Sequence, residues 1–206
     1  MRADLGEDAG LGQSGGALFW VAVAGPSGAG KDTLLDAVRA ELAGDPRFHF
    51  ARRSVTRPET PAGTIGGEAH EPLSAEGFEA EVSAGAFILH WRAHGLGYGI
   101  RHAEAPAGRV AVLSLSRAVL TQAAALRPLR VIEVTAPTAV LAQRLARRGR
   151  EDAASIAARL AREMPLPEGL DVTRVINDGP VAQGAAELRA ALEGVAASCA
   201  QAGFRP

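Results

Sequence analysis

A chain of 206 residues with 47% hydrophobic and 22% charged side chains has the composition of one globular domain. Its formal net charge of -1 argues against a nucleic-acid binder, which needs a strongly basic surface. The single cysteine excludes an internal disulfide framework, and no apolar run reaches the ~18 residues of a membrane span, so we expect a cytoplasmic protein without membrane contact.

Residues 1–16 are acidic and rich in glycine, and we expect a disordered tail before a single domain over 17–206. Short apolar runs that end in turn residues predict strands, and apolar residues three or four apart predict helices. The predicted strands cover 17–24, 48–56, 87–91, 110–115, 131–135 and 172–176. The predicted helices cover 31–43, 74–83, 117–126, 138–148, 152–162 and 181–197. This alternation predicts an α/β fold with a parallel sheet, whose ligands bind beyond the carboxyl ends of the strands.

A glycine-rich turn joins the first predicted strand to the first predicted helix. Its residues match the phosphate-binding pattern G-x-x-x-x-G-K: Gly25, Pro26, Ser27, Gly28, Ala29, Gly30 and Lys31. Backbone N–H groups of such a loop turn inward around phosphates, and the following helix adds a partial positive charge. The lysine reaches the β- and γ-phosphates of ATP. A glycine-rich turn without a ligand is the weaker alternative, because the strand–loop–helix context and the lysine are both present.

The residue after Lys31 is Asp32, where the pattern has a serine or threonine that binds Mg²⁺, and Thr33 follows. We expect either that the Thr33 hydroxyl replaces the missing one or that the Asp32 carboxylate approaches the metal, directly or through water. A first-turn acid favoured by the helix dipole is an equally good explanation of Asp32. The sequence therefore predicts an ATP–Mg²⁺ site with two candidate metal ligands.

Six arginines and no lysine lie in the segment 144–163, around Gly149. A planar guanidinium suits phosphate oxygens, and phosphoryl transfer needs positive charge around the moving group. We therefore interpret the segment as an arginine-rich lid that excludes water, in preference to a solvated basic surface. Its arginines are Arg144, Arg147, Arg148, Arg150, Arg159 and Arg162.

These motifs together resemble a known family. The chain is similar to guanylate-kinase-like P-loop kinases from the P-loop to Asp178. Within that fold it is most similar to the ribose 1,5-bisphosphate phosphokinases of phosphonate metabolism, the PhnN family. The resemblance is carried by GPSGAGKDTLL (25–35), SVTRP (54–58), HWRAHGLGYGI (90–100), SR (116–117), RLARRGRE (144–151) and VINDG (175–179).

The resemblance implies an acceptor-binding region at about 48–101 that keeps phosphate-binding positions of guanylate kinases. Arg57 and Tyr98 match a phosphate-binding arginine and tyrosine of that family, and His70 stands where it has a second such tyrosine. The second arginine of the family's R-P-P-R element is absent, since Thr60 occupies its place.

The positions that recognise guanine in guanylate kinases are all changed in this chain. Arg53 replaces a serine, His90 a glutamate and Ser116 an aspartate. These changes remove acceptors for the ring N–H groups of guanine and add donors, which suit a second phosphate. We therefore expect ribose 1,5-bisphosphate as the acceptor, with Arg53 and Arg117 at its second phosphate.

On the donor side, the resemblance implies that Arg144, Arg148 and Arg159 are catalytic lid arginines and that Asn177 and Asp178 lie along the adenine. The implied reaction converts ATP and ribose 1,5-bisphosphate to ADP and 5-phosphoribosyl 1-diphosphate, without a general base because the attacking phosphate oxygen is already anionic. Two alternatives stay open here: a kinase for GMP or another nucleoside monophosphate, and a catalytically inactive interaction module of the same fold.

Overall fold

A parallel five-stranded sheet forms the centre of the molecule. The computed structural model describes residues 19–57, 70–147, 156–158, 160 and 165–201. The strand order is β2 (Phe48–Phe50), β7 (Val110–Ser114), β1 (Phe19–Ala24), β8 (Leu129–Thr135) and β9 (Asp171–Ile176), and every neighbouring pair is parallel. The predicted α/β fold with a parallel sheet is confirmed.

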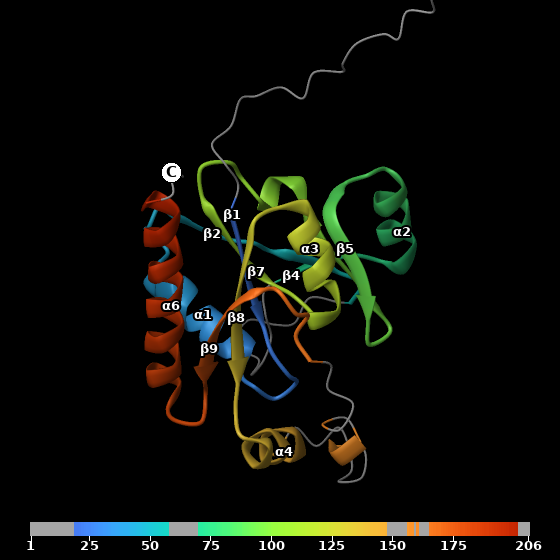
Figure 1. Cartoon of the computed structure of the whole chain (residues 1–206). Helices are drawn as coiled ribbons and strands as arrows, with labels where there is room; N and C mark the ends of the chain where they lie inside the picture. Colours follow the sequence, from blue (N-terminus) through green and yellow to red (C-terminus); the bar gives the residue numbers. More distant parts are fainter. Residues whose placement is uncertain (1–18, 58–69, 148–155, 159, 161–164, 202–206) are drawn as a thin grey trace, which may run out of the picture.

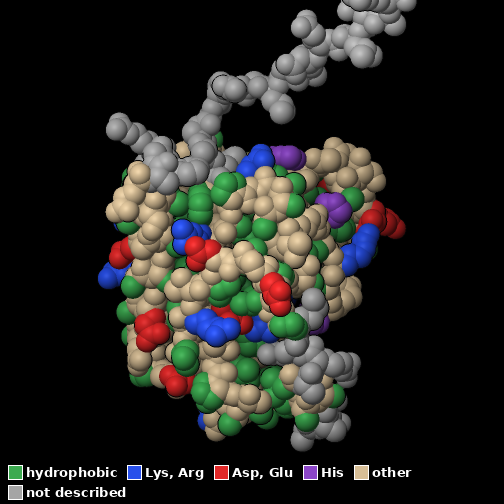
Figure 2. All heavy atoms as spheres, viewed as in Figure 1, with side chains coloured by type: hydrophobic (Ala, Val, Ile, Leu, Met, Phe, Trp, Pro, Cys, Tyr) green, Lys and Arg blue, Asp and Glu red, His purple; other side chains and the backbone are tan. Residues whose placement is uncertain are grey.

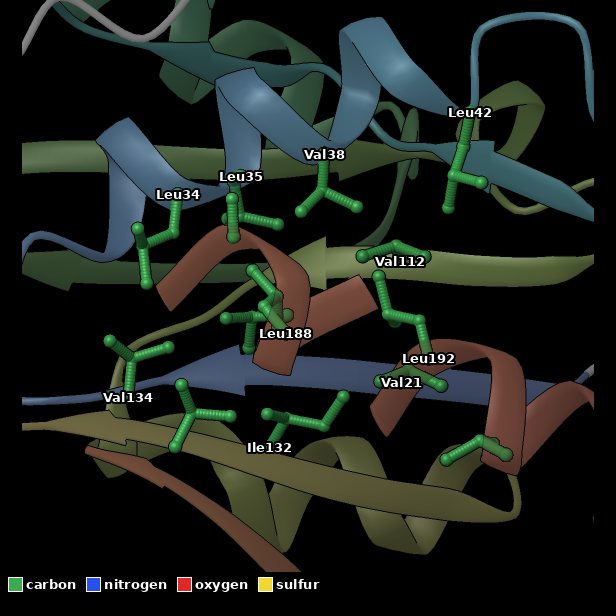
Figure 3. Close-up of a cluster of buried hydrophobic side chains, with 14 of the residues drawn as sticks. Val21, Leu34, Leu35, Val38, Leu42, Val112, Ile132, Val134, Leu188 and Leu192 are labelled. Carbon is green, nitrogen blue, oxygen red and sulfur yellow. The ribbon is translucent and has the colours of Figure 1, made fainter. Parts of the chain in front are cut away.

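Two helices cover one face of this sheet, on the left of Figure 1: α1 (Lys31–Glu41) and α6 (Val181–Gln201). Alternate residues of β1 point to this face, and Val21 and Val23 meet Leu34 and Val38 of α1 in one buried cluster. Figure 3 shows Leu188 and Leu192 of α6 in the same layer. The cluster fixes α1 on the sheet, and with it the loop that precedes α1.

A second sheet of four strands lies on the opposite face, in the order β4 (His70–Pro72), β3 (Arg53–Val55), β6 (Leu96–Arg101) and β5 (Phe87–Ala93). Strands β3 and β4 are parallel, whereas β6 is antiparallel to both β3 and β5. The prediction of one strand over 48–56 was wrong, because the chain leaves the large sheet after Ala51 and begins β3 in the small one. Strands β4 and β6 were not predicted.

Helix α2 (Ala75–Ser83) covers the outer face of the small sheet. The Phe78 and Phe87 rings stack 5.4 Å apart over two glycines of β6. A Cβ at Gly97 would lie 2.7 Å from the Phe78 ring, and one at Gly99 would lie 2.5 Å from the Phe87 ring. Residues of β6 without side chains are therefore required where the aromatic rings pack.

The inner face of the small sheet packs on the large sheet. Trp20, Ala22 and Ala24 of β1 share a buried cluster with Tyr98 and Ile100 of β6. The two faces of β1 thus belong to two different cores, as the alternation of side chains along a strand requires. The packing brings the small sheet to the carboxyl ends of β1 and β7.

The remaining elements complete the frame. Two short 3₁₀ turns are η1 (His102–Glu104) and η2 (Arg117–Val119), and η2 continues into α3 (Leu120–Leu126). Helix α4 (Thr138–Arg147) follows β8. The predicted tail over 1–16 and most of the predicted helix over 152–162 lie outside the described residues. No described helix is long and apolar enough to cross a membrane, and charged side chains of both signs are scattered over the face in Figure 2.

An ion-pair cluster ties α2 and β4 to Arg101 at the end of β6. Arg101 Nε donates to Glu71 Oε2 at 2.6 Å, and Arg101 Nη2 lies 2.7 Å from Glu81 Oε2. The hydrogen bonds from the Arg101 guanidinium hold the pKa of Glu71 below its ordinary value, against the opposing effect of burial. The resulting stabilisation is present above the unfolded-state pKa of Glu71 and is lost as the pH falls through its folded-state pKa.

Candidate active site

The predicted phosphate loop connects β1 to α1, as expected. Gly30 is the N-cap of α1 and has a left-handed backbone with φ of 83°. A Cβ on Gly30 would lie 2.5 Å from the Asn177 side chain, and one on Gly25 would lie 2.0 Å from the Val134 carbonyl oxygen. Gly30 is thus required by its backbone geometry and by close packing, and Gly25 is required by close packing. The remaining loop positions, Pro26, Ser27, Gly28 and Ala29, are buried or half-buried between β1 and α4.

The far side of the loop is held by β9 and α4. Asn177 Nδ2 donates to the Ala29 carbonyl oxygen at 2.7 Å, and Arg144 Nη1 donates to the same oxygen at 3.3 Å. Asn177 is 5% exposed, whereas Asp178 is exposed to solvent. The structure therefore brings Asn177 and Arg144 to the loop, and it leaves Asp178 at the surface beside them.

We expect Asn177→Ala to weaken both the fold and the loop. The substitution leaves the buried Ala29 carbonyl with only the longer Arg144 contact, which should lower the free energy of unfolding by about 1–3 kcal/mol. Urea unfolding measures this loss, and calorimetric titration should show weaker binding of ATP. Ile176→Ala is the matched control, because the neighbouring Ile176 side chain is 53% exposed. Equal stability of the two variants would contradict this role of Asn177.

Lys31 reaches across from α1 to the end of β7. Its Nζ donates to Ser114 Oγ at 2.6 Å and forms an ion pair with the Asp32 carboxylate. Ser114 is 3% exposed and sits on the last position of β7, opposite Val23 in register. Thr33 is exposed on the first turn of α1. Among the described residues, no group of three His, Cys, Asp or Glu side chains could form a metal site.

The same serine connects to the small sheet through its backbone. Arg53 Nη1 donates to the Ser114 carbonyl oxygen at 3.4 Å, and the Arg53 guanidinium lies 5.4 Å from the centre of the Tyr98 ring. The Tyr98 ring in turn stacks on Trp91, with ring centres 5.3 Å apart. Lys31 and Arg53 therefore both contact Ser114 at the carboxyl edge of the large sheet, and Tyr98 lies beneath the Arg53 guanidinium.

Arg57 follows β3, and His70 begins the neighbouring strand β4. His70 is fully buried, pairs with Arg53 in the β3–β4 ladder, and its Nε2 lies 3.3 Å from the Arg57 carbonyl oxygen. Arg57 is half-buried, and its Nε has no hydrogen-bond partner within the described part of the chain. The His70 ring thus contacts the backbone of Arg57 and supports the residue predicted to bind phosphate.

His90 is separated from Tyr98 by the strand register. Trp91 pairs with Tyr98 and His90 pairs with Gly99, so His90 lies on the face of the small sheet that α2 covers. The exposed His90 side chain accordingly lies on the opposite face from Tyr98 and Arg53. The structure does not bring His90 together with the other predicted acceptor residues, and we leave it out of the proposed site.

A buried carboxylate holds Arg117 near the same edge of the sheet. Arg117 Nη2 donates to Glu133 Oε1 at 3.0 Å, and Arg174 Nε donates to Glu133 Oε2 at 2.8 Å. Glu133 is 7% exposed and lies beside Ala24 in the β1–β8 ladder, immediately before the phosphate loop. Ser116 caps η2 by accepting from the Ala118 N–H at 3.4 Å.

Sequence reasoning missed Ser114 and Glu133. Each is a polar residue in an otherwise apolar, buried strand, VAVLS in β7 and LRVIEVT in β8. Such a residue is costly to bury without a partner, and this was the available signal. The predicted catalytic lid arginines Arg148 and Arg159 lie outside the described residues, so Arg144 is the only one of the three that the structure describes.

Several known proteins are similar to this chain, although no protein-family model matches it. A ribose 1,5-bisphosphate phosphokinase PhnN of Brucella melitensis is 48% identical over 167 residues, covering 79% of this chain and 85% of that protein. A second PhnN, of Methylobacterium radiotolerans, is 47% identical and covers 84% of this chain and 96% of that protein.

A longer relative and a solved structure extend the comparison. The bifunctional ribose 1,5-bisphosphokinase-thymidine phosphorylase of Azorhizobium caulinodans is 47% identical over 86% of this chain, which spans only 26% of that protein. The crystal structure of guanylate kinase from Anaplasma phagocytophilum matches with a TM-score of 0.59 at 16% identity, covering 87% of this chain and 86% of that one. The second likeness concerns the fold alone.

Proposed function

The chain belongs to the family of ribose 1,5-bisphosphate phosphokinases, and from that premise we propose that it phosphorylates ribose 1,5-bisphosphate with ATP. An oxygen of the phosphate on C1 attacks the γ-phosphorus of ATP. The bond from that phosphorus to the bridging oxygen breaks, ADP leaves, and 5-phosphoribosyl 1-diphosphate forms. The attacking oxygen is already anionic, so this chain has to position the two phosphates and neutralise their charge.

The meeting of Lys31 and Arg53 on Ser114 carries the proposal. Lys31 belongs to the loop proposed to bind the ATP phosphates. Arg53 belongs to the small sheet, at a position where guanylate kinases have a guanine-binding serine. Both side chains contact Ser114, Lys31 its hydroxyl and Arg53 its carbonyl, and this supports a site where a cation proposed for the ATP phosphates lies near one proposed for the acceptor. Such an arrangement suits a transfer between two anionic groups, because both must be held at bonding distance.

Further side chains are proposed to bind the two phosphate groups of the acceptor. Arg57 and Tyr98 are the proposed ligands of one phosphate, and Arg53 with Arg117 those of the other. Glu133 holds the Arg117 side chain and shares its charge, which leaves Arg53 as the principal contact. Arg144 is proposed to act on the donor phosphates together with the lid residues Arg148 and Arg159.

The nucleotide is proposed to bind as its magnesium complex. Mg²⁺ bound there would supply positive charge that neutralises the phosphates during the transfer. The Asp32 carboxylate beside Lys31 is a hard oxygen ligand of the type that Mg²⁺ accepts, and its side chain is 36% exposed. Thr33, the other candidate, lies exposed on α1.

Measuring ADP release with a panel of acceptors tests the proposal. Ribose 1,5-bisphosphate should accelerate ADP release from ATP, whereas ribose 5-phosphate should not, because it lacks the phosphate that attacks. Acceleration by both sugars to the same extent would contradict the assignment of the C1 phosphate as the nucleophile.

Arg53→Ala should lower kcat/KM for ribose 1,5-bisphosphate by about 10- to 100-fold, the scale of a lost charge-assisted hydrogen bond. The KM for ATP should change little, because Arg53 belongs to the acceptor side. Arg92→Ala is the matched control, since Arg92 is exposed and pairs with Glu79 on the outer face. Steady-state kinetics that showed equal losses for both substrates would contradict this role of Arg53.

A further inference from the structure

Two oxygen ligands from different elements converge on the Lys31 ammonium. One is the Asp32 carboxylate of the first turn of α1, and the other is the Ser114 hydroxyl, 2.6 Å from Nζ at the end of β7. Positions 31 and 114 are 83 residues apart in the chain, so only the fold brings these groups together. A carboxylate and a hydroxyl that both contact an ammonium group are oxygen ligands of the kind that also bind a metal cation.

The usual P-loop enzyme holds its metal with the same two chemical groups in the opposite places. There a serine or threonine follows the P-loop lysine, and an aspartate comes from a second strand. In this chain the residue that follows the lysine is the acid, and the residue on the neighbouring strand β7 is the hydroxyl. One carboxylate and one hydroxyl are present in both arrangements, so the total charge of the pair is the same.

We propose that Asp32 and Ser114 together form the Mg²⁺ site of this chain, with the acid and the hydroxyl exchanged between the phosphate loop and β7. The proposal rests on the proposed use of an ATP–metal complex. It assigns to Ser114 a role in metal binding, directly or through a metal-bound water, and it makes Asp32 the ligand that supplies negative charge.

The burial of the two residues supports this division. Ser114 is 3% exposed and its position is set by the pairing of β7 with β1, so its hydroxyl is presented rigidly. The Asp32 side chain is 36% exposed and can meet an incoming ion. Mg²⁺ is commonly bound through one or two carboxylates together with substrate phosphates, so a single acid suffices.

Restoring the usual arrangement tests the exchange. Binding of Mn²⁺ in the presence of ADP is measured by electron paramagnetic resonance for the native chain, Asp32→Ser, Ser114→Asp and the double variant. Asp32→Ser should weaken Mn²⁺ binding by about tenfold or more, the equivalent of losing one ~1.4 kcal/mol contact. The double variant, which has the hydroxyl after the lysine and the acid on β7, should regain native affinity to within about threefold.

Several outcomes would overturn the proposal. The exchange is wrong if the folded double variant binds Mn²⁺ no better than Asp32→Ser does. Should the double variant fail to fold, Ser114→Ala decides: it should weaken Mn²⁺ binding severalfold, and unchanged binding would reduce Ser114 to a support for Lys31. A loss caused by Thr33→Val but not by Ser114→Ala would move the hydroxyl to α1.

Two controls separate this proposal from the proposed function. Asp36→Ser removes an exposed acid one turn further along α1, and it should leave Mn²⁺ binding unchanged. If native protein showed no binding of Mn²⁺ that depends on ADP, the metal–nucleotide complex itself would be wrong. If the Asp32→Ser variant bound Mn²⁺ as tightly as the native protein does, only the proposed exchange of the two ligands would be overturned. Neither result would bear on the choice of ribose 1,5-bisphosphate as the acceptor.

Discussion

GMP should be a poor acceptor for this chain, with kcat/KM several orders of magnitude below the value for ribose 1,5-bisphosphate. Guanine recognition needs hydrogen-bond acceptors for the ring N–H groups, and the structure places the Arg53 guanidinium, which has donors only, over Tyr98. Losing matched hydrogen bonds of this kind lowers kcat/KM for the unmatched substrate by roughly 10⁴-fold to 10⁵-fold. Both constants are measured with the same ADP-release assay at saturating ATP.

The strand register strengthens this expectation. His90, the residue expected to replace the family's glutamate, lies on the outer face of the small sheet and offers no acceptor beside Tyr98. Ser116 offers a hydroxyl in place of the family's aspartate, and this hydroxyl already accepts a 3.4 Å hydrogen bond from the Ala118 N–H. Similar kcat/KM values for GMP and the bisphosphate would contradict the assigned acceptor and would leave a P-loop kinase of broader specificity.

Lys31→Ala should lower turnover by about two orders of magnitude or more while the protein stays folded. The side chain is the only preorganised cation that bridges α1 and β7 in the described loop region, through Asp32 and Ser114. Removing one such contact to developing charge has this scale of effect on the reaction rate. Single-turnover transfer from labelled ATP measures the loss in the chemical step itself.

The composition of the chain offers a second measurement on the native protein. Lys31 is its only lysine, all other basic side chains being arginine or histidine. Apart from the α-amino group, Lys31 is therefore the only amine that an amine-reactive reagent should modify. Bound ATP should slow the modification of Lys31. Near-native turnover of Lys31→Ala, or labelling of Lys31 that ATP does not slow, would contradict its contact with the phosphates.

The parallel sheet and the phosphate loop could be predicted because their signals are local. Apolar runs identify β1, β7 and β8, and the glycine pattern before Lys31 identifies the loop. Strand β6 carries no such signal, since its glycines at 97 and 99 are disfavoured in strands and are needed only because the Phe78 and Phe87 rings lie on them. That reason lies in the tertiary packing.

The site could be predicted only in part, because many of its contacts depend on tertiary packing. Contacts of Lys31 with Ser114 and of Arg117 with Glu133 join residues of separate strands and helices, so no local pattern specifies them. The position of His90 depends on register, because a shift of one residue moves a side chain to the other face of a strand. Matching the motif gives the residue type at position 90 and its approximate place in the sheet. Only the pairing of His90 with Gly99 shows on which face of the sheet the side chain lies.

Identification of the product distinguishes transfer to the C1 phosphate from transfer to a sugar hydroxyl and from hydrolysis of ATP. Native protein is incubated with ATP, Mg²⁺ and ribose 1,5-bisphosphate, and the phosphorus NMR spectrum is followed. We expect the C1 phosphate signal to be replaced by two coupled signals of a diphosphate on C1, while the C5 phosphate signal stays. ADP should appear in an amount equal to that of the diphosphate product. A new phosphate ester on a ribose hydroxyl, or inorganic phosphate with an unchanged sugar, would contradict the proposed transfer to the C1 phosphate.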